Sequence, residues 1–245
     1  EAIQGENLRL QQLVLADRAA VPEDAAVLLM VGAQRGLLPQ ERQAIAGYLS
    51  RGGNAVFLNQ PNTDSGIAEI VAPLGIDVGD DVIIEKSVQL FQGPSYDAQS
   101  IVNSYSPHEI TRDFKKSTIF PTATSVRKGK DVPDGCIVTE LAATGKESWA
   151  EKKVDLVFST EPQAALDAED LAGPVALAAA LDCTGARKGE QNDAGDEARA
   201  KPAGRVVVIG DADFVNNANI RQLFNRDFFL NILNWTLGEE DGVTI

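Results

Sequence analysis

Two acidic side chains that follow an apolar run are the residues of this sequence best suited to chemistry. Asp211 and Asp213 come directly after the run 205–209, and Asn216 follows three residues later. Carboxylate and amide oxygens at such spacing could hold a hard cation. An aspartate after a strand also accepts backbone N–H bonds and shapes the next turn. Because the glycine and distant glutamate of a calcium loop are missing, we predict no metal site here.

Further polar side chains follow two other apolar runs. Gln34 comes shortly after 27–31, and Asn59 comes directly after 55–58. In open parallel sheets, ligands gather where the carboxyl ends of the strands meet. These side chains are mostly uncharged, which suits recognition of hydroxyl groups or loop structure better than acid–base work.

The single histidine, His108, lies in the polar segment 104–111. With no cysteine nearby, we interpret it as a hydrogen-bonded structural residue and leave a ligand contact open. The candidate ligand-binding residues are therefore Gln34, Asn59, His108, Asp211, Asp213 and Asn216.

No catalytic motif accompanies these residues. Cys183 follows an apolar run, but 181–185 (LDCTG) lacks the first small residue of a nucleophile elbow. The motifs of serine hydrolases, P-loop nucleotide binding and dinucleotide binding do not occur. We therefore expect no enzyme, no catalytic residue and no cofactor. The alternatives are a hydrolase of a carbohydrate or amide that uses Asp211, Asp213 and His108, and a purely structural scaffold.

The composition excludes some classes of binding partner but does not identify the cellular compartment. The formal net charge is −14, and no Lys/Arg cluster exceeds a doublet, which argues against a surface for nucleic acid or anionic lipid. Cys136 and Cys183 have no metal-ligand spacing. They are compatible with one disulfide or with two buried thiols.

The elements that must position these residues alternate along the chain. The runs 27–31 and 55–58 predict strands, and helical patterns follow each of them, from Pro39 and from about Asp64. We expect further strands at 137–141, 154–158, 173–181 and 205–209, and a helix over 225–237. This order predicts a single α/β domain over 1–245, a mostly parallel sheet with helices on both faces. The polar stretch 184–203 predicts a mobile insertion.

Several segments, taken in order, resemble the extracytoplasmic domain of the gliding-motility-type ABC transporter auxiliary family, whose eukaryotic relatives include an intraflagellar transport subunit. The segment that most resembles this family is 204–214 (GRVVVIGDADF). The others are 27–32, 45–53 (IAGYLSRGG), 106–111 (SPHEIT), 144–149 (TGKESW), 173–178 (GPVALA) and 225–231 (NRDFFLN) with Trp235.

This resemblance implies a flavodoxin-like or class I glutamine amidotransferase-like fold without a catalytic triad. It also implies a noncatalytic binding or interaction domain beside an ABC permease and ATPase, with a small-molecule or saccharide ligand left open. The position it implies is extracytoplasmic (periplasmic), tethered to the membrane through segments absent from this chain.

Overall fold

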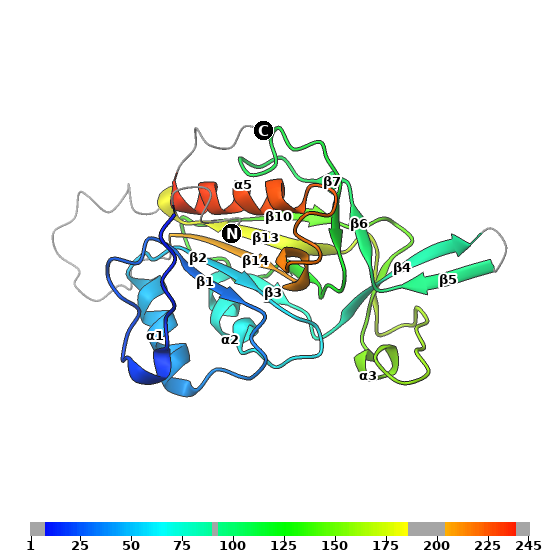
Figure 1. Ribbon diagram of the computed structural model, residues 1–245, viewed down its shortest axis with the longest axis horizontal. Helices are drawn as coiled ribbons and strands as arrows, with labels where there is room; N and C mark the ends of the chain where they lie inside the picture. The colour runs from blue at the N-terminus through cyan, green and yellow to red at the C-terminus, as the bar shows by residue number, and fades with distance from the viewer. Residues whose placement is uncertain (1–7, 90–92, 186–203, 239–245) are drawn as a thin grey trace.

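The computed structural model describes residues 8–89, 93–185 and 204–238 (Figure 1). From residue 186 onward, the predicted mobile insertion lies outside the described residues. The main sheet has the strand order β1-β2-β14-β13-β10-β7. Its strands are β1 (Leu28–Val31), β2 (Ala55–Leu58), β7 (Ser104–Tyr105), β10 (Ile137–Ala143), β13 (Ala176–Asp182) and β14 (Arg205–Ile209).

The direction of these strands corrects the predicted fold class. Only β1 with β2 and β2 with β14 run parallel, whereas β14 with β13, β13 with β10 and β10 with β7 run antiparallel. Strand β14 begins beside the end of β13, where Arg205 pairs with Asp182, so the chain returns along the same edge and the two strands run antiparallel. The prediction of a mostly parallel sheet flanked by helices, flavodoxin-like or class I glutamine amidotransferase-like, is therefore wrong.

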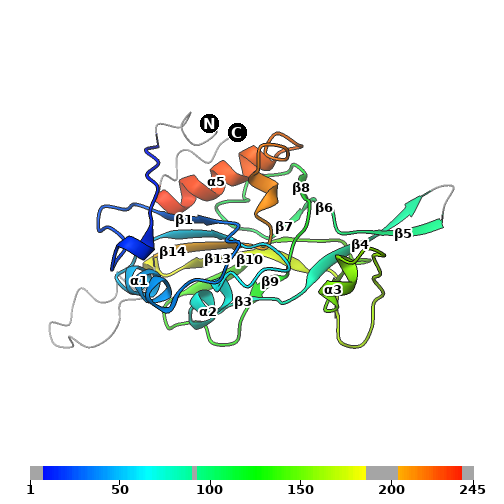
Figure 2. The same ribbon diagram turned by 60° about the horizontal axis from the view of Figure 1, so that its bottom comes forward.

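The central strands β2, β13 and β14 are mainly apolar because each face of the sheet is covered. Helix α5 (Asn225–Leu237) packs on one face, and α1 (Pro39–Ser50) and α2 (Ile67–Val71) pack on the other (Figure 2). Side chains alternate between faces along a strand. In β14, Val207 and Ile209 join the core under α5, while Val206 and Val208 join the core over α1 and α2. This burial fixes the position of the loop that follows β14.

Three smaller antiparallel sheets extend the molecule beyond the main sheet. They have the orders β12-β11-β4-β5, β3-β9 and β6-β8. Their strands are β3 (Ile76–Val78), β4 (Val82–Gln89), β5 (Gly93–Asp97), β6 (Ser100–Val102), β8 (Thr118–Phe120), β9 (Val126–Lys128), β11 (Trp149–Glu151) and β12 (Leu171–Ala172). In Figure 1, β4 and β5 project away from the main sheet.

The strand predicted at 154–158 is wrong, because a short helix, α3 (Val154–Val157), occupies this stretch. The buried Glu151 side chain accepts hydrogen bonds from Lys153 N (3.0 Å) and Ala165 N (3.2 Å). These bonds hold the chain in a turn immediately after β11. Short 3-10 helices cover Leu15–Asp17, Ala72–Leu74 and Asp213–Val215.

The two cysteines form a disulfide, Cys136–Cys183, between segments 47 residues apart. It links the residue before β10 to the residue after β13. The choice that the sequence left open between a disulfide and two thiols is thereby decided.

Candidate functional site

The carboxyl ends of the three parallel strands meet at one edge of the main sheet. Gly32 N donates to Leu58 O (3.0 Å), and Asn59 N donates to Ile209 O (2.8 Å). The loops after β1, β2 and β14 therefore begin side by side. Five of the six predicted ligand-binding residues lie in these loops: Gln34, Asn59, Asp211, Asp213 and Asn216.

Asp211 is the fully buried member of this group, and its carboxylate is used by the backbone. Its Oδ1 accepts from Asp213 N (2.6 Å), and its Oδ2 accepts from Thr122 N (3.1 Å). Burial raises the pKa of Asp211 to about 7, although these N–H bonds act in the opposite direction. Both oxygens point at protein donors, so Asp211 shapes the turn and does not face a ligand.

Asp213 extends this network toward the surface. Its carboxylate accepts from Gln60 Nε2 (3.1 Å) and from Asn216 Nδ2 (3.1 Å). The Oδ1 atom of Asn216 accepts in turn from the backbone N–H groups of Ala218 (2.9 Å) and Asn219 (3.0 Å). We call Gln60, Thr122, Asp211, Asp213 and Asn216 the strand-end cluster.

Asn59 and Gln34 do not join this cluster by any hydrogen bond. The buried Asn59 side chain accepts from Ser65 Oγ (2.7 Å), which places it under the start of α2. The exposed Gln34 side chain donates to Gly32 O in its own loop (3.2 Å). The shared edge thus brings the predicted residues near one another without making their polar groups converge.

A glycine at the end of β14 allows the backbones around the cluster to approach closely. Gly210 exchanges backbone hydrogen bonds with Leu177 O (2.8 Å) and Thr124 N (2.9 Å). A Cβ atom at this position would lie 2.0 Å from Thr124 O. Only glycine fits between these strands, so the GDAD sequence is a packing requirement of the fold.

His108 lies at the other end of β14, beside Trp235 and Arg205. The His108 and Trp235 rings meet edge-on at 4.8 Å, and Arg205 lies over the Trp235 ring. The other end of α5 contacts the strand-end region, since Asn225 Nδ2 donates to Phe214 O (3.1 Å). Ten residues of helix separate Asn225 from Trp235, which is roughly 15 Å. His108 and Asp211 therefore do not belong to one catalytic centre.

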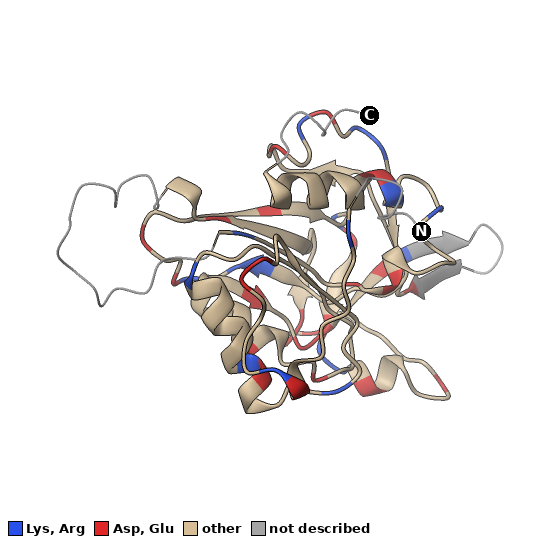
Figure 3. Cartoon of the chain, turned by 60° about the vertical axis from the view of Figure 1, so that its left-hand side comes forward, with Lys and Arg blue, Asp and Glu red and all other residues tan. Residues whose placement is uncertain are grey.

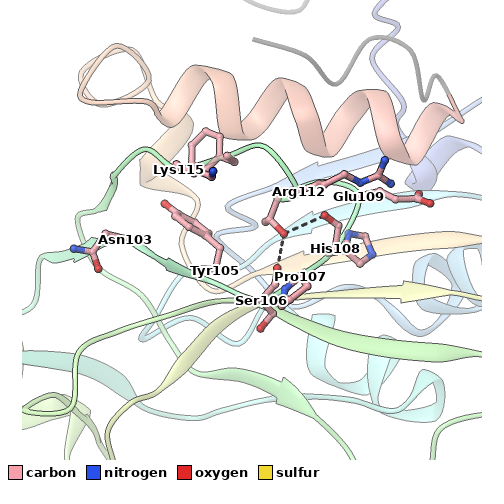
Figure 4. A pocket seen from close by; sticks show the side chains of 10 residues that line it. Asn103, Tyr105, Ser106, Pro107, His108, Glu109, Arg112 and Lys115 are labelled. Carbon is pink, nitrogen blue, oxygen red and sulfur yellow. Dashed lines mark hydrogen bonds between the residues drawn. The ribbon is translucent and has the colours of Figure 1, made fainter.

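A pocket of about 630 Å³ opens beside His108 (Figure 4). Its lining comes from a single stretch of chain, β7 and the loop that follows it. His108, Glu109 and Arg112 lie at one end, and Asn103, Tyr105 and Lys115 lie at the other. Ser106, Pro107, Thr111 and Phe114 complete the lining. We call this the His108 pocket.

Hydrogen bonds within the loop hold the walls of this pocket in place. Thr111 Oγ1 donates to Ser106 O (2.5 Å), and Ile110 N donates to His108 Nδ1 (3.2 Å). The Tyr105 hydroxyl is bonded to Val102 O (3.0 Å) and lies 2.8 Å from Thr118 Oγ1. The pocket is thus a built part of the fold.

Burial favours the neutral forms of two side chains in the pocket, His108 and Tyr105. Burial lowers the pKa of His108, against the charges of Glu109 and Asp182, which raise it. Because Nδ1 accepts a hydrogen bond, the neutral imidazole carries its proton on Nε2. Burial also raises the pKa of Tyr105 to about 12. The other acidic and basic side chains that line the pocket are Glu109, Arg112 and Lys115.

The acidic residue of the pocket, Glu109, contacts other protein groups, whereas its two cationic residues are exposed to solvent. Glu109 accepts from Trp235 Nε1 (2.8 Å) and lies 4.0 Å from the Arg205 guanidinium. Arg112 and Lys115 are exposed, and neither forms an ion pair with a residue that the structure describes. Positive charge is consequently available to a ligand.

Sequence reasoning identified His108 but missed Arg112, Lys115 and Tyr105. The stretch 92–116 has no clear periodicity, so nothing in it predicts which side chains share a wall. The segment SPHEIT, noted for its resemblance to a family, was the only signal that pointed to this loop.

The described parts of the chain contain neither a metal-binding cluster nor a membrane-spanning helix. Within 8–89, 93–185 and 204–238, no group of three or more His, Cys, Asp or Glu side chains is arranged to hold a metal ion. Across these same ranges, no helix has the length and apolar character needed to cross a membrane.

Comparison with solved structures supports the fold. The chain is similar to the mmIFT52 N-terminal domain, with a TM-score of 0.60 and 13% sequence identity, over 96% of this chain and 87% of that one. It also matches a ThuA-like protein from Bacteroides uniformis, with a TM-score of 0.42 and 12% identity, over 86% of this chain and 69% of that one. A comparison with curated proteins found no match.

A family model described as "ABC-type uncharacterized transport system" matches residues 4–232, which include the main sheet, the strand-end cluster and the His108 pocket. The mmIFT52 likeness agrees with the resemblance to an intraflagellar transport subunit drawn from the sequence. The chain therefore belongs to this auxiliary family of ABC-type transport systems.

Proposed function

We propose that the chain is a noncatalytic ligand-binding domain of an ABC transport system, working beside its permease and ATPase subunits. Membership of the family supports the association with transport. The observation that carries the binding role is the His108 pocket, where Arg112 and Lys115 face a built cavity without ion-pair partners among the described residues.

The ligand class follows from the groups that line the pocket. Two cations favour a ligand that carries a carboxylate or another negative group. Tyr105 and Phe114 offer aromatic faces, and Asn103 and Ser106 offer hydrogen-bonding groups. A small acidic molecule, such as an acidic saccharide, matches this combination of charge, hydroxyl recognition and apolar surface.

The hydrolase alternative receives no support from the geometry. It needs Asp211, Asp213 and His108 to converge within hydrogen-bond reach of one substrate. Asp211 and Asp213 are bonded into the turn after β14, and His108 lies beside Trp235 at the far end of α5. The scaffold alternative differs from our proposal only in whether the pocket binds anything.

The proposed location is extracytoplasmic, with a membrane tether outside this chain. The Cys136–Cys183 disulfide supports this location because disulfides persist in oxidising compartments. An alkaline-phosphatase fusion to the full-length protein would test it. Activity of the fusion in cells would support the proposal, and an inactive but folded fusion would contradict it.

Binding can be tested by calorimetric titration of the chain with trigalacturonate, and with maltotriose as a neutral saccharide of the same length. We expect trigalacturonate to bind and Arg112→Ala to weaken its binding about tenfold or more, since a hydrogen bond to a charged group contributes roughly 1.5–3 kcal/mol. Lys130→Ala is the matched control, because Lys130 is exposed outside the pocket. If neither saccharide binds, or Arg112→Ala binds normally, the acidic-ligand site is wrong.

A further inference from the structure

An exposed apolar pair lies in the turn that leads into α5. The exposed fractions are 51% for Leu223 and 36% for Phe224. Leu223 has a φ of +46°, a left-handed conformation that leucine rarely adopts. Such backbone strain clusters at functional sites. Here it holds a leucine out in solvent, where a glycine would be unstrained.

Basic side chains from two distant segments surround this pair. The amine of Lys116 lies 4.9 Å from the Phe224 ring centroid, and Phe224 N donates to Ser117 O (3.2 Å). Arg221 and Arg226 flank the pair along the chain, and both are exposed. In Figure 3, blue segments lie at the start of α5 and on the loop next to it.

The local charge is opposite to that of the chain as a whole. The segments 112–116 and 221–227 carry five cations, namely Arg112, Lys115, Lys116, Arg221 and Arg226. They carry two acids, Asp113 and Asp227. The chain has a net charge of −14. No run of Lys or Arg along the sequence is longer than two residues, and the sequence analysis therefore argued against a surface for anionic lipid. Folding assembles the patch from two segments.

We propose that the Leu223–Phe224 turn and its cations dock on an anionic membrane surface. A leucine and an aromatic ring surrounded by Lys and Arg are suited to shallow insertion at the lipid headgroups. An acidic protein partner would also be attracted, but the apolar part consists of two side chains, whereas a specific protein interface buries about 800 Å² on each partner. Shallow insertion into a bilayer does not require a buried area of this size. Two of its cations, Arg112 and Lys115, also line the proposed ligand pocket, whereas Lys116, Arg221 and Arg226 lie outside it.

Salt screens the repulsion between an anionic membrane and the acidic residues on the rest of the chain. At about 0.1 M salt the Debye length is about 10 Å, so acids elsewhere are screened from a bilayer that touches the turn. Each Lys or Arg close to an anionic membrane strengthens binding about fivefold. We therefore expect weak binding by this chain alone, dependent on anionic lipid and decreasing with salt.

Co-sedimentation of the chain with vesicles tests the proposal. Vesicles of phosphatidylcholine with roughly 30% phosphatidylglycerol should bind it, and pure phosphatidylcholine vesicles should not. Leu223→Gly should weaken binding about tenfold, given the free energy of burying a leucine. Its thermal stability should be unchanged or higher, because glycine adopts this backbone conformation without strain. Arg221→Glu should weaken binding by about fivefold or more.

Two variants elsewhere control for general effects of hydrophobicity and charge. Leu166→Gly removes another exposed leucine, 55% exposed, and Lys130→Glu reverses another exposed cation. Both should bind vesicles as the unmodified chain does. If the folded chain fails to bind anionic vesicles, or if Leu223→Gly and Arg221→Glu bind as well as the controls, the proposal is wrong. Capture by immobilised poly-glutamate without vesicle binding would overturn it in favour of an acidic protein partner.

Discussion

The strand-end cluster lies near the start of α5, whereas the His108 pocket extends along this helix from Phe228 to Trp235, and the two regions differ in where their polar groups point. In the cluster, the Asp211 and Asp213 carboxylates accept hydrogen bonds from the protein itself. In the pocket, Arg112 and Lys115 are exposed and have no ion-pair partner in the part of the chain that the structure describes.

This difference separates groups that stabilise the fold from groups that can bind. A polar side chain whose oxygens are occupied by backbone donors has little capacity left for a ligand. Substitutions in the cluster should therefore reduce stability, and those of the pocket cations should reduce binding while leaving stability intact.

Gly210→Ala should have the largest effect of any substitution in either region. The added Cβ would lie 2.0 Å from Thr124 O, so the strands around the cluster must separate. We expect a loss of roughly 3 kcal/mol or more in the free energy of unfolding, the range of severe packing defects. Urea denaturation followed by circular dichroism measures it. A variant as stable as the unmodified chain would show that the close approach at Gly210 is not required.

Asp211→Ala should be the next most damaging change. It leaves the partly buried N–H groups of Thr122 and Asp213 without their acceptor, at a cost of roughly 2–3 kcal/mol. Equilibrium unfolding gives the loss, and Arg112→Ala serves as the comparison with an expected change within about 0.5 kcal/mol. Equal losses in the two variants would remove the distinction between the regions.

The two regions should respond to pH in opposite directions. The folded pKa of Asp211 is raised from 3.8 to about 7, so its contribution to stability is full below 3.8 and is lost as pH rises through about 7. The folded pKa of His108 is lowered from 6.5, so its contribution is present above 6.5 and is lost as pH falls.

Unfolding curves measured between about pH 4 and pH 8 separate these contributions, each limited to about 1.4 kcal/mol per pH unit. Asp211→Ala should remove the decline in stability toward neutral pH. His108→Gln should remove the decline toward acid. Unchanged pH profiles in both variants would contradict the burial assigned to these groups.

Asn216→Ala and Gln34→Ala should have the smallest effects. The Asn216 side chain accepts hydrogen bonds from two backbone N–H groups and donates one to the Asp213 carboxylate. These bonds lie at the surface, so the substitution should lower the free energy of unfolding by about 1 kcal/mol. Gln34 is exposed and bonds only within its own loop, so its loss should stay within about 0.5 kcal/mol. Thermal unfolding measures the two losses of stability. A larger loss for Gln34→Ala than for Asn216→Ala would place Gln34 in a hydrogen-bond network that the structure does not show.

The sequence was sufficient to predict most elements that position the strand-end cluster. The apolar runs of β1, β2 and β14 and the helix over 225–237, which ends at Gly238, were predicted from periodicity and turn residues. Asn225 is a residue type that often caps a helix, but its side chain bonds the backbones of Ile119 and Phe214. Local patterns reveal where an element ends, and tertiary contacts decide what its end residues do.

Strand direction and the pocket could not be predicted in the same way. An apolar run such as β13 looks alike whether its neighbour is parallel or antiparallel, since both faces are buried either way. The short run 154–158 fits strand and helix equally. Arg112 and Lys115 line the same pocket as His108 only because the loop after β7 is folded by Thr111 and held against α5.

Hydrogen–deuterium exchange of the chain with and without trigalacturonate tests the central claim most directly. It reports which of the two regions a ligand protects. If the pocket binds and the cluster serves the fold, exchange should slow within 103–115 and remain unchanged within 210–216. Slower exchange confined to 210–216 would contradict the account, because the cluster would then be the binding site.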